Sequence, residues 1–179
     1  MNNRLKNILK ISVFSGFVIV VVILTGQIRS ASAESISSTD NLALSLVNEY
    51  RSNTGLRRLE WNDKLAEAAQ DKAEDMKNDK YFEHRSPDGK VAWDFIIAEG
   101  YDYSKAGENL AIDFKNVKDA TIAWELSPSH LRNIASSGYT DFGFAQTNAN
   151  IEGKPTIVFV QLFAKPQSIY DRALENINK

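Results

Sequence analysis

Apolar residues recur at helical spacing along the first half of the chain. An N-cap at Asp40 predicts a first helix that runs to about Ser52. Its apolar positions are Leu42, Leu46, Val47 and Tyr50. Asn62 or Asp63 predicts the start of a second helix. One face of this helix is apolar, through Leu65, Ala68, Ala69, Ala73 and Met76. The opposite face is expected to be a solvated stripe of Glu67, Asp71, Lys72, Glu74 and Asp75.

Three shorter helical segments follow. The first covers residues 91–99, and its expected inward positions are Val91, Phe95 and Ala98. The next covers residues 117–125, with Ala120, Ala123 and Trp124 on its apolar face. Ser127 as N-cap and Pro128 at the first helical position then predict a new helix to about Ile134. This places His130 in the first turn of that helix, where the helix dipole favours a neutral imidazole.

In other segments the spacing of apolar residues is that of a strand rather than that of a helix. Residues 58–61 are extended in character, and residues 139–146 and 156–164 predict an antiparallel hairpin. In the second hairpin strand both faces are apolar, with Ile157, Phe159 and Phe163 on one and Val158, Val160 and Leu162 on the other. Such a strand is covered on both sides. The predicted fold class is therefore α+β, a three-layer α-β-α sandwich with a small antiparallel sheet.

The residue patterns at the two ends of the sequence predict segments that do not belong to this domain. Residues 1–33 combine a basic start, an apolar run and a small-x-small site at Ala31 to Ala33, which is typical of a secretory signal peptide. An uncleaved membrane anchor is the alternative, since the apolar run is only slightly shorter than a spanning helix. Residues 34–39 are interpreted as a linker, residues 40–166 as the folded domain, and residues 167–179 as a tail that can be helical.

Charge narrows the range of partners. Removal of residues 1–33 takes away four basic and no acidic residues, which leaves 17 basic against 23 acidic side chains. An acidic surface disfavours nucleic acid as a partner. The chain has no cysteine, so neither a disulfide nor a thiolate ligand is available. The core alone must stabilise the domain.

The candidate chemistry gathers around two histidines. His84 and His130, the only histidines of the chain, both lie in turn-rich polar segments, and Glu108 lies between them in the sequence. Two histidines and a glutamate form a known catalytic zinc set, with water as the fourth ligand. A hydrogen-bonded structural network of the same three side chains is the alternative. Serine catalysis is not favoured, since Ser127 is explained as an N-cap and no Gly-x-Ser-x-Gly motif occurs.

The order of several short motifs resembles a known family. They are Val47-Asn48-Glu49-Tyr50-Arg51, the segment 59–65, Phe82-x-His84, Gly107-Glu108-Asn109-Leu110, Trp124-x-x-Ser127-Pro128-x-His130 and the strand 159–163. Together they resemble the CAP superfamily of cysteine-rich secretory, antigen 5 and pathogenesis-related 1 proteins, and most closely its small bacterial secreted SCP-like branch. The resemblance covers roughly residues 40–165. It implies an α-β-α sandwich with a cavity lined by two histidines and acidic residues.

The resemblance also assigns residues to that cavity. His84, Glu108 and His130 match family positions, and Asn109 is expected at a turn or the cavity rim. Ser127 stands where a second glutamate is often found, with Glu125 nearby. The cavity set is therefore His84, Glu108, Ser127, His130, Asn109 and Glu125, with His84, His130 and Glu108 as candidate ligands of a divalent metal such as zinc.

Three functions remain open from the sequence. The leading hypothesis is a secreted or cell-envelope module that binds a small ligand, a lipid, a metal or a protein, and is not an enzyme. A metal-dependent hydrolase of peptide or cell-wall material is the first alternative. An extracellular interaction scaffold is the second.

Overall fold

The computed structural model describes residues 36–170 together with Ala173 and Ile177. Every element below belongs to the unit Ser35–Lys179. The predicted signal peptide, the start of the linker and most of the predicted tail helix lie outside the described residues. Within the described part, no helix is long and apolar enough to cross a membrane.

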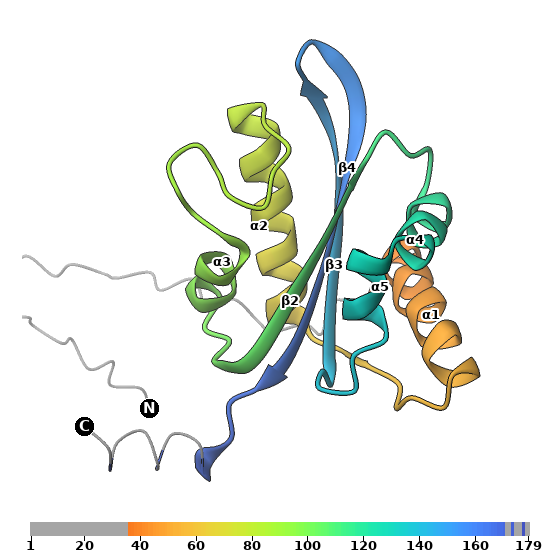
Figure 1. The fold of residues 1–179 in the computed structure, drawn as a ribbon. Coiled ribbons are helices and arrows are strands. Elements are labelled where there is room, and N and C mark those ends of the chain that lie inside the picture. Colours follow the sequence, from red (N-terminus) through yellow and green to blue (C-terminus); the bar gives the residue numbers. More distant parts are fainter. Residues whose placement is uncertain (1–35, 171–172, 174–176, 178–179) are drawn as a thin grey trace, which may run out of the picture. The chain divides into compact units, whose positions relative to one another are not determined.

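The described residues form five helices around a four-stranded sheet (Figure 1). The helices are α1 (Ser38–Asn53), α2 (Asp63–Asp79), α3 (Ala92–Ala98), α4 (Val117–Leu126) and α5 (Pro128–Ile134). The strands are β1 (Glu60–Trp61), β2 (Tyr103–Ile112), β3 (Asp141–Ile151) and β4 (Lys154–Pro166). The strand order is β1-β3-β4-β2, antiparallel except for the short parallel pair β1–β3, so β2 is an edge strand.

The α-β-α sandwich predicted from the sequence is confirmed. Helices α2 and α3 cover one face of the sheet, and α1, α4 and α5 cover the other (Figure 1). β4 contributes to both cores, because alternate side chains of a strand point to opposite faces. Val158, Val160 and Leu162 pack on the α2 side, and Phe159 and Phe163 pack on the α1 side.

Close backbone packing joins α2 to the sheet. A Cβ atom added at Gly143 of β3 would collide with the backbone of Leu65 and Ala66. Glycine is therefore required here for the approach of helix to strand rather than for an unusual backbone angle. The contact fixes the distance between the start of α2 and the sheet.

Several predicted details are corrected. Ser37, not Asp40, is the N-cap of α1, because its hydroxyl accepts a hydrogen bond from the backbone N–H of Asp40. The predicted linker therefore overlaps the helix. In α3 the buried residues are Ala92 and Ile96 rather than the expected Val91, Phe95 and Ala98. Strand β2 was not predicted at all.

Candidate functional site

Edge strand β2 carries the centre of the candidate site. Successive side chains of β2 point to opposite faces, so Glu108 faces the layer of α2 and α3, whereas Asn109 faces α5. His84 approaches from the loop between α2 and α3, and His130 lies in α5. The edge position of β2 thus brings two segments from opposite layers to the same strand.

His84 and Glu108 form a close pair. His84 Nδ1 lies 2.5 Å from Glu108 Oε2. The His84 side chain is 66% exposed, whereas that of Glu108 is only 4% exposed. The hydrogen bond to Glu108 raises the pKa of His84 above its usual value, against the opposing effects of burial and of Lys72. The second carboxylate oxygen, Oε1, is buried and has no hydrogen-bond partner in the described residues.

His130 differs from His84 in its surroundings. Its Nδ1 lies 2.9 Å from Ser127 Oγ, and Pro128 occupies the first position of α5 as predicted. The Ser127 hydroxyl makes no capping bond to the backbone, so its side chain serves His130 instead. Burial, and then the charge of His84, lower the pKa of His130. The imidazole therefore favours its neutral form, the direction expected from the sequence.

Amide side chains connect the sheet to α5. Fully buried Asn109 donates to His130 O at 3.3 Å and to Gln161 Oε1 at 3.2 Å. Asn133 of α5 donates to Asn109 Oδ1 at 2.8 Å and to Glu108 O at 2.9 Å. Asn109 is thus a buried connector that positions α5, rather than a rim residue.

A buried lysine lies behind the pair and was misassigned from the sequence. Lys72 of α2 was expected on the solvated face but is fully buried. Its ammonium donates to Tyr81 Oη at 2.8 Å and to Glu83 O at 3.1 Å. Burial lowers the pKa of Lys72, against the attraction of Glu108 and two aspartates. Lys72 therefore places a positive charge near the buried carboxylate of Glu108.

An open cavity of about 300 Å³ adjoins the pair. Its walls come from the 84–93 segment, β2 and α5, and the lining residues are His84, Val91, Ala92, Trp93, Ala106, Gly107, Glu108 and Asn133. Because Gly107 has no side chain, Tyr139 and Asn133 can pack closely against its backbone. A Cβ atom at this position would collide with Tyr139 Oη and Asn133 Oδ1. The cavity is large enough for a small ligand.

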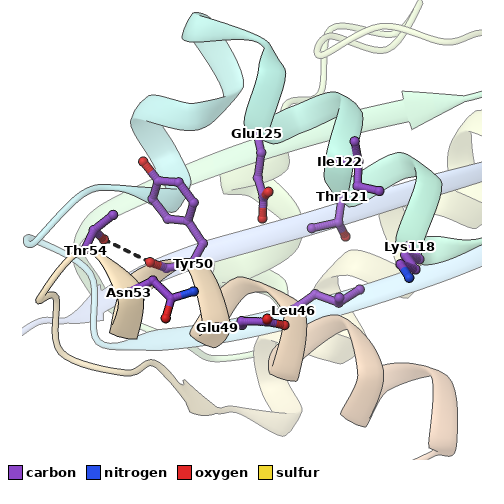
Figure 2. A pocket seen from close by; sticks show the side chains of 9 residues that line it. All are labelled: Leu46, Glu49, Tyr50, Asn53, Thr54, Lys118, Thr121, Ile122 and Glu125. Carbon is purple, nitrogen blue, oxygen red and sulfur yellow. Dashed lines mark hydrogen bonds between the residues drawn. The ribbon is translucent and has the colours of Figure 1, made fainter.

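The predicted cavity set is only partly assembled. His84 and Glu108 line the cavity, whereas Asn109, Ser127 and His130 are not among its lining residues. Glu125 lines a different hollow between α1 and α4 (Figure 2). In the described residues, no three His, Cys, Asp or Glu side chains are grouped closely enough to hold a metal ion. Glu108 is placed to orient His84 rather than to serve beside it as a third ligand.

Two proteins of Bacillus subtilis (strain 168) are similar in sequence. The chain is 32% identical over 114 residues to the uncharacterized protein YkwD, covering 64% of this chain and 44% of YkwD. It is 33% identical over 107 residues to the uncharacterized membrane protein YlbC, covering 60% of this chain and 31% of YlbC. The match thus spans less than half the length of either relative.

Solved structures share the fold. An extracellular SCP-domain protein of Bacillus anthracis superposes with a TM-score of 0.62 at 26% identity, covering 71% of this chain and 40% of that protein. An outer surface protein of Borrelia burgdorferi gives a TM-score of 0.63 at 22% identity, covering 71% of this chain and 92% of that one. The second likeness concerns the fold alone. The model of the cysteine-rich secretory protein family, CAP, matches residues 44–163, and the chain therefore belongs to the CAP family.

Proposed function

We propose that this chain is a binding module of the cell exterior that acts without turnover and takes its ligand in the His84–Glu108 cavity. The extracellular location is supported by the similar SCP-domain protein of Bacillus anthracis, which is described as extracellular. The predicted signal peptide agrees with this location. The binding role is supported by the geometry of the cavity itself.

The observation that carries the proposal is the state of the Glu108 carboxylate. A buried polar atom is normally hydrogen-bonded, and an unpaired one costs free energy. Oε1 of Glu108 is buried without a partner in the described residues, on a side chain that lines an open cavity. A ligand that brings positive charge close to the carboxylate would relieve that cost. The cavity thus favours a cationic ligand.

A divalent metal such as zinc is the first candidate ligand. Histidine ligands of metals commonly donate their other ring N–H to a carboxylate or another oxygen, which fixes the ring and its tautomer. Glu108 holds His84 in this way, and Ser127 Oγ contacts the same ring atom of His130. No described residue bonds Nε2 of either ring. Nε2 of His84, which lines the cavity, would hold the ion, and water would complete its coordination.

The hydrolase alternative has less support. Ser127 and His130 are within hydrogen-bond distance, which resembles a nucleophile and its base. A catalytic pair also needs a third group that orients the base. No described carboxylate bonds the remaining nitrogen of His130, and neither residue lines the cavity. The contact is therefore better explained as a local bond that fixes the His130 ring.

Titration of the metal-free full chain with zinc by isothermal calorimetry tests the proposal. We expect saturable binding near one equivalent, lost in His84→Ala and weakened about ten- to hundredfold in Glu108→Gln, the range for outer-shell partners of metal ligands. Glu152→Gln, an exposed change in the β3–β4 turn, is the matched control and should bind as the parent does. Absence of binding, or equal binding by His84→Ala, would contradict the metal assignment.

A further inference from the structure

A second hollow lies between α1 and α4 (Figure 2). Both helices belong to the layer on the opposite side of the sheet from α2 and α3 (Figure 1). Its volume is about 340 Å³, similar to that of the His84–Glu108 cavity. The two share no lining residue. We call this hollow the α1–α4 groove. It plays no part in the function proposed above.

Two carboxylates face each other across the α1–α4 groove. Glu49 comes from α1 and Glu125 from α4. Figure 2 shows both between Tyr50 at one end and Lys118 at the other. Burial, and then the negative charge of Glu49, raise the pKa of Glu125. No cation of the described residues forms an ion pair with either carboxylate, so the groove, with two carboxylates and one lysine in its lining, carries a net negative charge.

Apolar side chains extend the groove along both helices. Leu46 and Ile122 form part of its lining. Leu42 lies one turn before Leu46, and Leu126 lies one turn after Ile122, so each pair shares a helix face. Ile122 in the lining is 45% exposed, and the side chains beyond it are exposed as well, Leu42 at 44% and Leu126 at 80%. Exposed apolar side chains around a hollow mark an interaction surface more often than isolated ones do.

We propose that the α1–α4 groove docks a peptide segment of a partner protein that inserts an arginine between Glu49 and Glu125. A neighbouring apolar side chain of the partner packs on Leu46 and Ile122. Arginine suits the site because its planar guanidinium can donate to two carboxylates and stack on an aromatic ring, here that of Tyr50. The apolar rows reach beyond the hollow, which favours an extended peptide over a small free amine.

Binding of two matched peptides to the full chain tests this proposal. The probe is acetyl-Leu-Arg-Leu-amide, and its control carries citrulline, the neutral isostere of arginine. We expect saturable binding of the arginine peptide by calorimetry and at least about tenfold weaker binding of the citrulline peptide. Glu125→Gln and Glu49→Gln should each weaken the arginine peptide about tenfold, since each removes one charged acceptor.

Two control variants separate this site from the rest of the molecule. His84→Ala should bind the arginine peptide as the parent does, because His84 does not line the groove. The peptide experiment therefore tests the groove even if the chain does not bind zinc. Glu152→Gln removes an exposed negative charge away from the groove and should also have no effect. Absence of binding at about 1 mM peptide, or equal affinity for the citrulline peptide, would overturn the proposal. Self-association of the chain that is lost in Glu125→Gln would assign the groove to a second copy and overturn it as well.

Discussion

Asn109→Ala should destabilise the domain strongly, because this side chain connects the sheet to α5. The variant loses two donated hydrogen bonds, to His130 O and Gln161 Oε1, and one accepted from Asn133. Each such bond contributes roughly 0.5–1.5 kcal/mol, and a buried group left unpaired costs more. Asn109 and Gln161 are both fully buried, so water cannot replace the lost bonds. We expect the free energy of unfolding to fall by about 3 kcal/mol.

Urea and thermal unfolding, followed by circular dichroism, measure this effect. A loss of about 3 kcal/mol corresponds to a melting temperature lower by roughly 10 °C for a chain of this size. Asn148→Ala is the matched control, since Asn148 also lies on a strand but is exposed, and it should change stability by less than about 0.5 kcal/mol. A loss below about 1 kcal/mol in Asn109→Ala, or an equal loss in Asn148→Ala, would refute the role of Asn109 as a connector.

The remaining predictions concern packing and protonation. Gly143→Ala should lower stability by about 1–3 kcal/mol or prevent folding, because its Cβ atom collides with the backbone of Leu65, and a melting curve like that of the parent would contradict this. Histidine NMR titration should place the pKa of His84 above and that of His130 below the usual value of about 6.5, and Glu108→Gln should lower the pKa of His84. Because a raised pKa means that the folded state binds the proton more tightly, the His84 pair stabilises the fold at low pH, and this contribution is lost as the pH rises through the folded pKa of His84. Equal titration of His84 in the parent and in Glu108→Gln would show that the hydrogen bond is not its cause.

The layers of the fold could be predicted because apolar periodicity is local information. The alternation along β4 correctly assigned Phe159 and Phe163 to one core and Val158, Val160 and Leu162 to the other. Strand β2 was missed because the Tyr103–Ile112 segment has one β-branched residue, Ile112, and contains the charged residues Lys105 and Glu108. Its pairing with β4, a tertiary interaction, stabilises it as a strand.

Lys72 is charged but lies on the buried face of α2. Its spacing from Ala68, Ala69 and Met76 places it within the apolar stripe of α2, and the structure buries it there. The spacing alone could have identified it. A lysine at a core position of a helix is rare unless it is paired, so it is a marker of a charged neighbourhood such as that of Glu108.

The candidate site could be predicted as residue types but not as an arrangement. His84 and Glu108 were expected together, and the structure places them in contact. Glu125 was grouped with them because it lies close to Ser127 in the sequence. Each helical residue turns the side-chain direction by about 100°, and Glu125 consequently lines the α1–α4 groove instead. Proximity in sequence does not specify which face of a helix a side chain occupies.

The most direct test of the central claim is an NMR titration of the imidazole nitrogens with zinc. If the His84–Glu108 cavity is the binding site, the Nε2 signal of His84 should show coordination near one equivalent, while its Nδ1 keeps the proton that faces Glu108. Imidazole signals that stay unchanged through saturating zinc would contradict the account, as would coordination through Nδ1 of His84.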